Sequence, residues 1–178
     1  MLRALPDLSR AWQSTLGEPV KVAIGINSGV ARVGNTGSRR KFKYGPLGNT
    51  VNLASRVQGA TKFLKTDMLV TAATRQELPG DTPARRLCTV RVVNIKGAVD
   101  LYEIRPDPDS TWPALCRAYE EALARFEQRD FHQATRILGN ILADHPQDGP
   151  SLVLLSRAVG ELIRPSEPFD PVWELSGK

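Results

Sequence analysis

Apolar and polar residues alternate with a period of two in several short segments of the first hundred positions, which is the pattern of half-buried β-strands. The first such segment is VKVAIGINSG, residues 20–29, with Val20, Val22, Ile24 and Ile26 on one face. A second strand, VARVGNTGS, is predicted to end in a turn at GNTG, residues 34–37, and is followed by KFKYG. The later strand-like segments are MLVT, TVRVVNIKG and VDLYEI. Gly97 and Ala98 separate the last two, which predicts a hairpin there.

Two segments of the same region have the helical period instead. Residues 1–17 place apolar residues at helical spacing without an uninterrupted apolar stretch, so they predict an amphipathic helix and not a signal peptide. In the second segment Asn49 is predicted to cap a helix that runs from Thr50 to about Leu64. Its apolar stripe consists of Leu53, Val57, Ala60 and Leu64, and we expect this stripe to face the core.

The composition changes at Pro106, where PDPDSTWP, residues 106–113, predicts a linker. Residues 114–164 have helical period, with breaks near Arg129 and at residues 146–150, and predict about three helices. The proline-rich residues 165–178 predict an extended tail on the surface. The buried aromatic positions of the helices are expected to be Trp112, Tyr119 and Phe126, which recur at intervals of seven.

Residues 129–148 resemble a tetratricopeptide repeat, with Ala134 and Pro146 twelve positions apart. The packing positions of this repeat would be Phe131, Leu138 and Ile141. A single repeat is too short to form a solenoid by itself, because stacked repeats bury each other's faces. We therefore expect these helices to dock onto the first part of the chain, and a protein partner for them is a minority alternative.

Composition and charge narrow the class of protein. The chain has 178 residues, of which 41% are hydrophobic and 24% charged, which is an ordinary globular balance. No window reaches the roughly 18–20 apolar residues of a membrane helix, so a soluble, cytoplasmic chain is expected, with the cytosolic part of a membrane-anchored parent as the alternative. Cys88 and Cys116 cannot form a disulfide framework, and they have no metal-ligand spacing with the two histidines.

The net charge of +5 allows the chain to bind anions, and SRRKFK, residues 38–43, is the densest basic run. We interpret this run as a solvated hairpin flank, since a nucleic-acid site normally has a broader basic face with interleaved aromatics. Nucleic acid is therefore not an expected partner. The phosphate of a small nucleotide stays open as a ligand.

Asn52 and Arg56 are the candidate functional residues of the predicted helix. Because a helix advances about 100° per residue, they lie within about 40° of each other, next to the apolar stripe and close to the helix amino end. That end favours an anion, since it carries unpaired N–H groups and the positive end of the helix dipole. Arginine could stabilise charge on a phosphoryl oxygen, and asparagine could hold a ribose oxygen.

Three ordered motifs extend this interpretation: the glycine-rich strand pair, GNTVNLASR at residues 48–56, and NIKG at residues 94–97. Together they resemble the carboxyl-terminal part of class III adenylate and guanylate cyclase catalytic domains, over about residues 1–105. The resemblance implies an α/β fold, an incomplete ferredoxin-like sandwich followed by a small all-α tail. It also implies a dimer with active sites at the subunit interface, and the conversion of ATP to cyclic AMP and pyrophosphate.

The resemblance assigns roles to individual residues. Asn52 and Arg56 match the pair that binds ribose and stabilises the α-phosphate, and Lys96 matches the lysine that holds the terminal phosphates. Gly45 falls where the family has a residue that reads the purine, and it has no side chain with which to do so. The choice between ATP and GTP is therefore undetermined.

The family needs Mg²⁺ or Mn²⁺, held by two aspartates on strands that would precede this chain. Before Asp67 the only acidic residues are Asp7 and Glu18, and they form no pair. We expect either a clipped enzyme or a natural half-domain that is inactive alone and needs a second copy or a complementing cyclase subunit. The alternative is a non-catalytic dimerisation or protein-interaction module derived from a cyclase.

Overall fold

The computed structural model of the protein describes residues 1–38, 41–93, 95 and 97–175. Within these ranges a five-stranded sheet has the order β1-β4-β6-β5-β7, and a separate two-stranded sheet consists of β2 and β3. The strands are β1 Ile24–Ile26, β2 Arg32–Ser38, β3 Lys41–Leu47, β4 Met68–Thr71, β5 Ala84–Val92, β6 Ala98–Ile104 and β7 Trp173–Leu175. The helices are η1 Leu2–Ala4, α1 Leu5–Leu16, α2 Asn49–Leu64, α3 Ala72–Glu77, α4 Trp112–Glu127, α5 Phe131–Asp144 and α6 Gly149–Ile163.

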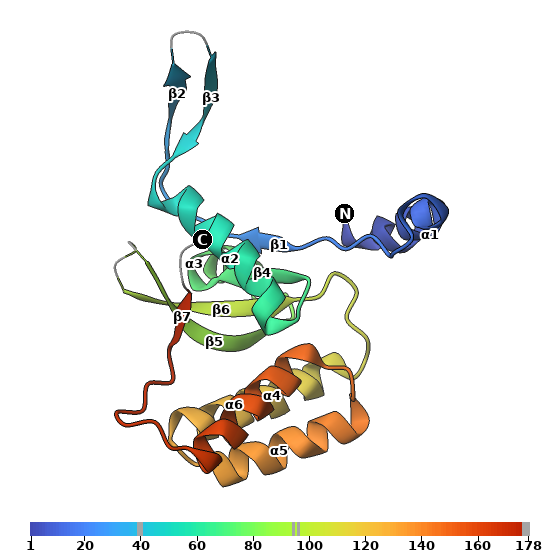
Figure 1. The fold of residues 1–178 in the computed structure, drawn as a ribbon, viewed down its shortest axis with the longest axis vertical. Coiled ribbons are helices and arrows are strands. Elements are labelled where there is room, and N and C mark those ends of the chain that lie inside the picture. The colour runs from blue at the N-terminus through green and yellow to red at the C-terminus, as the bar shows by residue number, and fades with distance from the viewer. Residues whose placement is uncertain (39–40, 94, 96, 176–178) are drawn as a thin grey trace.

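The five-stranded sheet is the centre of the molecule. β1 pairs with β4 in parallel, and β4 and β5 each pair with β6 in antiparallel register. In Figure 1 the three helices α4–α6 lie together below this sheet, and the β2–β3 hairpin projects from the opposite end. The expected fold class, an α/β unit followed by a small all-α tail, is thus confirmed.

Helix α2 packs its apolar stripe on the sheet, as the sequence predicted. Leu53, Val57, Ala60 and Leu64 are all buried. The helix ends at Leu64, and Lys65 takes the left-handed conformation with φ of 52°. Asn52 and Arg56 lie beside this stripe on the outer side of the helix, where Asn52 is exposed and Arg56 is half-buried.

The helical tail shares one hydrophobic core with the sheet. Trp112, Tyr119 and Phe126 are all at most 1% exposed, which confirms the expected aromatic core positions. Helix α4 lies against β5, and the Tyr119 hydroxyl donates a hydrogen bond of 3.0 Å to the Leu87 carbonyl oxygen. The tail therefore covers the β5 side of the sheet.

A buried charge cluster joins the sheet to the tail. Arg85 on β5 is 0% exposed and pairs with Glu103 on β6 and with Asp148, the N-cap of α6, at 2.9 Å. Its guanidinium also lies over the rings of Trp112 and Tyr119. Because every charge in this cluster has an opposite partner, the cluster fixes how the tail sits on the sheet.

Several boundaries differ from those that the sequence predicted. The β1 ladder covers only three residues of the ten-residue segment, and β5 begins at Ala84, five residues before the predicted strand. Residues 34–37 are not a turn: they lie within β2, where Gly34 pairs with Gly45 and Gly37 with Phe42. An isolated two-stranded ribbon in solvent tolerates glycine, since no layer of side chains has to pack on it.

The carboxyl-terminal tail also differs from its prediction. It contains no helix among residues 165–175, as expected, but it ends in a strand: β7 pairs in parallel with β5. The proline pattern reveals the absence of a helix, whereas the pairing depends on an edge of β5 that the sequence does not show.

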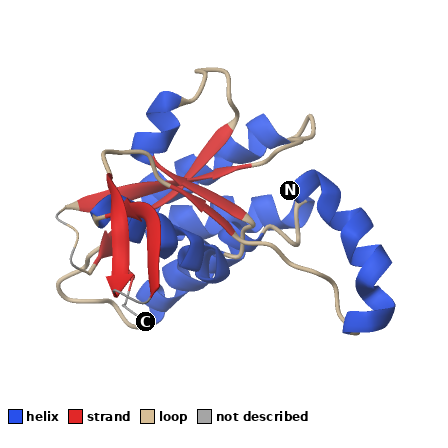
Figure 2. Cartoon of the chain, turned by 90° about the horizontal axis from the view of Figure 1, so that it is seen from above, coloured by secondary structure: helices blue, strands red, loops and turns tan. Residues whose placement is uncertain are grey.

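Helix α1 stands apart from the sheet, joined to it by a loop (Figures 1 and 2). None of its residues is buried, and Leu8, Trp12 and Leu16 on its apolar side are about half exposed. Among the helices that the structure describes, none combines the length and apolar character needed to cross a membrane.

The two cysteines are both free and buried, in agreement with the sequence. Burial raises the pKa of the Cys88 thiol to about 12 and that of Cys116 to about 11. Neither thiol is therefore ionised at neutral pH, and both act as small apolar core groups.

Candidate functional site

The amino end of α2 is the start of the candidate site. The N-cap is Gly48, with φ of 117°, and Asn49 is already the first helical residue, so the predicted cap at Asn49 is wrong by one position. No side chain caps this end, because glycine has none to offer. The first-turn N–H groups of Asn49 and Thr50 are thus available to an external acceptor.

Asn52 and Arg56 line one surface pocket with the end of β5. The pocket has a volume of about 310 Å³, and its walls come from two elements: Asn49, Asn52, Ser55 and Arg56 on α2, and Val92, Val93 and Ile95 in and after β5. Arg56 is the only charged side chain among these lining residues. The pocket therefore combines one cation, two amides, a hydroxyl group and an apolar wall, which is a suitable surface for an anionic ligand with an apolar or ribose part.

Close packing holds α2 in place beside this pocket. A Cβ atom at Gly25 of β1 would lie 2.1 Å from the Gln58 backbone nitrogen and 2.8 Å from the Ala54 carbonyl oxygen. Only a glycine therefore allows the helix to approach the strand this closely. The contact is made by the turn that contains Arg56, since Ala54 and Gln58 flank that residue.

A small hydrogen-bond network fixes the first turn of α2. The Asn27 side-chain amide donates to the Thr50 carbonyl oxygen at 3.0 Å, and Thr71 donates to the Asn27 Oδ1 at 2.8 Å. The Thr50 hydroxyl donates to the Val30 carbonyl oxygen at 2.6 Å. Sequence reasoning missed Asn27. The only available signal was a polar residue directly after a strand, which is too common to single out.

The other two predicted site residues have different outcomes. Lys96 lies outside the described residues, so its role stays a prediction, although its neighbour Ile95 lines the pocket. Gly45 lies in β3 opposite Gly34 and is not among the residues that line the pocket. A Cβ atom at Gly45 would meet nothing within 4 Å.

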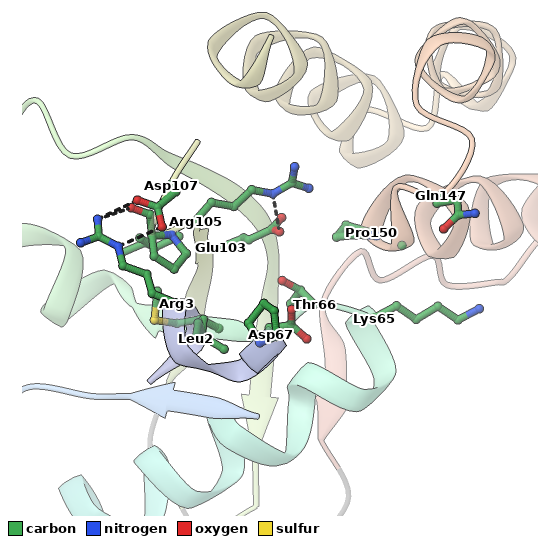
Figure 3. Close-up of a pocket in the computed structure, with 15 residues that line it drawn as sticks. Leu2, Arg3, Lys65, Thr66, Asp67, Glu103, Arg105, Asp107, Gln147 and Pro150 are labelled. Atoms are coloured by element: carbon green, nitrogen blue, oxygen red, sulfur yellow. Dashed lines mark hydrogen bonds and ion pairs between the residues drawn. The ribbon is translucent and has the colours of Figure 1, made fainter. Parts of the chain in front are cut away.

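A larger cavity, of about 510 Å³, lies elsewhere, where the amino end of the chain meets the start of α6 (Figure 3). Two ion pairs join charged lining residues within the cavity wall: Arg3 pairs with Asp107 at 2.7 Å, and Arg105 pairs with Glu103 at 3.3 Å. We regard the smaller pocket as the candidate site, since it brings Asn52 and Arg56 together and Arg56 has no ion-pair partner among the described residues.

The described residues do not form a metal centre. Within the described ranges, His, Cys, Asp and Glu side chains nowhere gather in a group of three that could hold a metal ion. The expected Mg²⁺ or Mn²⁺ is therefore not matched by a donor set in this part of the chain.

Comparison with known proteins points to one family. Residues 2–104 match the family described as adenylate and guanylate cyclase catalytic domain. The chain is similar to adenylate cyclase 1 of Rhizobium meliloti (strain 1021), at 32% identity over 84 residues that cover 47% of this chain and 13% of that protein. It is also similar to the terminal-differentiation specific adenylate cyclase of Dictyostelium discoideum, at 24% identity over 147 residues that cover 79% of this chain and 7% of that protein. The chain thus spans only a small part of the length of either relative.

Proposed function

Because the chain belongs to the adenylate and guanylate cyclase catalytic domain family, we propose that it forms the ribose and phosphate side of a nucleotide site at a seam between two protomers. The observation that carries this proposal is the pocket of Asn52 and Arg56 beside the uncapped first turn of α2. Its volume of about 310 Å³ is at the small end for a ligand site, as expected for one half of a shared site.

The proposed reaction converts ATP to 3′,5′-cyclic AMP and pyrophosphate. The ribose 3′-oxygen bonds to the α-phosphorus and loses its proton, while the bond from that phosphorus to the bridging oxygen breaks and pyrophosphate leaves. Both relatives named above are adenylate cyclases, which supports ATP over GTP. At Gly45, where the family has a residue that recognises the purine, the chain has no side chain that could distinguish adenine from guanine.

Each residue would act by positioning and electrostatics. Arg56 would bind the α-phosphate oxygens, where charge increases in the transition state, and Asn52 would orient the ribose. The first-turn N–H groups of α2 would add to the positive potential. Lys96 would hold the terminal phosphates.

The partner protomer would be a second copy or a complementing cyclase subunit. It would have to contribute the two metal-binding aspartates; in support, the described residues hold no group of three or more His, Cys, Asp or Glu side chains that could bind a metal ion. We therefore propose that the chain by itself is inactive. Detectable cyclic AMP from the purified 178-residue chain with Mg²⁺ or Mn²⁺ would refute this half of the proposal.

The test mixes this chain with a cyclase subunit that carries the two aspartates and measures cyclic AMP formation. Arg56→Ala should lower kcat by about 10³- to 10⁵-fold, because a well-placed arginine contributes that much to phosphoryl transfer. Asn52→Ala should lower kcat by about 10²-fold. The matched control is Arg136→Ala, an exposed arginine on α5.

The outcomes of this test are distinct. Equal activity of Arg56→Ala and the unmodified chain would remove Arg56 from the mechanism. Stable association with the subunit but no turnover would instead favour a non-catalytic dimerisation or protein-interaction module.

We also propose the domain division that the sequence predicts: a cyclase part at residues 1–105, a linker at 106–113, tetratricopeptide-like helices at 114–164 and an extended tail at 165–178. The first of these helices, α4, begins at Trp112, within the predicted linker. The pairwise packing of α4 with α5 and of α5 with α6 supports the repeat-like assignment. So does the burial of Leu138 and Ile141, two of its three predicted packing positions, while the third, Phe131, is half-buried.

A further inference from the structure

The carboxyl-terminal segment 165–175, here called the strap, returns from the end of α6 to the sheet (Figure 1). It is anchored on the helical tail, where the Phe169 ring packs against Phe126 and Phe131 with ring centroids 5.5 Å and 5.2 Å away. The strap then ends in β7, at the edge of the sheet. It therefore spans the helical tail and the sheet.

The strap meets β5 at the wall of the candidate site. In the parallel ladder Val90 lies opposite Trp173, Arg91 opposite Glu174 and Val92 opposite Leu175. Val92 lines the pocket of Asn52 and Arg56, and Val93 follows it directly. The strap is thus paired with the part of β5 that forms the apolar wall of the pocket.

Arg157 of α6 holds the strap from the side of the helices. Its guanidinium lies over two rings, 5.0 Å from the centroid of Phe126 and 4.6 Å from that of Trp173. It donates hydrogen bonds of 2.8 Å to the Pro171 carbonyl oxygen and 2.9 Å to the Asp170 carbonyl oxygen. Arg157 thus binds both the backbone of the strap and the ring of Trp173, and in this way holds the strap against α6.

Arg91 holds the strap from the side of the sheet. It pairs with the Asp170 carboxylate at 3.2 Å and with the Glu174 carboxylate. Arg91 is the residue directly before Val92, so these ion pairs act next to the pocket wall. Both arginines thus hold the same part of the strap, residues 170–174.

We propose that the strap is a positioning element of the nucleotide site, which holds the end of β5 so that Val92 and Val93 stay fixed relative to Asn52 and Arg56. Without it, Val90 and Arg91 would keep only β6 as a ladder partner, and the β7 side of β5 would become an open edge next to the pocket. A pocket wall that has to be ordered on binding lowers ligand affinity. The ligand, a nucleoside triphosphate, is taken from the proposed function, on which this inference rests.

The experiment uses the full chain and two strap variants. Asp170→Asn with Glu174→Gln removes both acidic partners of Arg91, and Trp173→Ala removes one of the rings beside Arg157. Binding of a fluorescent ATP analogue should weaken by about 3- to 10-fold, the usual size of coupling between neighbouring elements. Amide hydrogen exchange at residues 90–93 should become faster. Asp7→Asn, which alters an exposed ion pair on α1, is the matched control and should change neither quantity.

A conservative variant separates positioning from general destabilisation. Arg91→Lys keeps a cation opposite Asp170 and Glu174, so its affinity for the ATP analogue and its amide exchange at residues 90–93 should stay close to those of the unmodified chain. If Trp173→Ala fails to fold, the exposed double variant decides the question, since its two carboxylates are more than half accessible.

The results distinguish the two proposals. Unchanged exchange at residues 90–93 in the strap variants would overturn the inference whatever happens to the nucleotide. Faster exchange with unchanged affinity, while Arg56→Ala weakens binding, would overturn the positioning role and leave the proposed function standing. If Arg56→Ala does not weaken binding, the proposed function fails, and the strap inference fails with it.

Discussion

Arg85 shows how a single residue links two parts of this molecule. Burial alone would lower the pKa of its guanidinium, but hydrogen bonds and charge attraction from Asp148 and Glu103 raise that pKa above the ordinary value. Removing one member of such a buried cluster leaves an uncompensated charge, which is far more costly than losing an exposed ion pair. The cluster is therefore a place where stability depends on pH.

Asp148 provides the test at this scale. Burial alone would raise its pKa, but hydrogen bonds and attraction from Arg85 and hydrogen bonds from Ser151 together lower it below 3.8. The unfolded chain therefore takes up this proton first as pH falls. The stabilisation is complete at neutral pH, begins to decline below about pH 5, and is lost as pH falls through the folded-state pKa.

Asp148→Asn should accordingly lower the free energy of unfolding by about 1–3 kcal/mol at pH 7, with the difference shrinking toward pH 3. Urea unfolding at a series of pH values measures this. Asp107→Asn, which removes an exposed partner of Arg3, is the control and should show no such trend. A difference that stays constant from pH 7 to pH 3 would contradict the assignment.

At the scale of elements, the placement of α2 depends on its contact with β1. Gly25→Ala would place a methyl group 2.1 Å from the Gln58 backbone nitrogen, so helix and strand must separate. We expect this to lower the free energy of unfolding by at least about 2 kcal/mol and to weaken nucleotide binding, since Asn52 and Arg56 move with the helix.

Gly59→Ala on the same helix is the matched control. A Cβ atom there meets nothing within 4 Å, so the substitution should be neutral or stabilising by about 0.5–1 kcal/mol through helix propensity. Chemical denaturation and titration with an ATP analogue compare the two variants. Similar behaviour of both would show that the close approach at Gly25 does not position α2.

At the scale of the whole molecule, the α/β part and the helical tail should unfold together. A Cβ atom at Gly149 of α6 would lie 2.3 Å from the Lys65 carbonyl oxygen at the end of α2, so the two parts are in close contact there. They also share the Arg85 cluster and one hydrophobic core. We expect a single calorimetric transition with equal calorimetric and van't Hoff enthalpies. Two resolved transitions would mean that the parts are independent domains.

Much of the secondary structure could be predicted because local patterns determine it. The stripe of Leu53, Val57 and Leu64 predicted both α2 and its buried side, and the spacing of Trp112 and Tyr119 predicted their burial. The break between α4 and α5 also falls where the sequence placed it, and the break between α5 and α6 lies at residues 145–148, slightly before the predicted 146–150. Each of these depends on residues within one or two turns of each other, so the neighbouring sequence contains the information.

Only one half of the candidate site could be predicted from local sequence patterns in the same way. Asn52 and Arg56 are one turn apart on a single helix, so the sequence alone places them together. The opposite wall, Val92 and Val93, comes from a strand some forty residues later, and no local pattern connects the two. Arg85 and Gly25 are similar cases: one has partners 18 and 63 positions away, and the other contacts a helix that begins after a hairpin.

From its residues alone, then, this chain determines the family to which it belongs, the periods of its helices and strands, and the polar pair at the start of α2. Tertiary structure decides which strand faces that pair, how the tail is fastened to the sheet, and that β7 closes the edge of β5 beside the pocket. The physical reason is that helical and strand periods arise within a few residues, whereas a close approach, a buried charge cluster or a strand pairing depends on segments that meet only after the whole chain has folded.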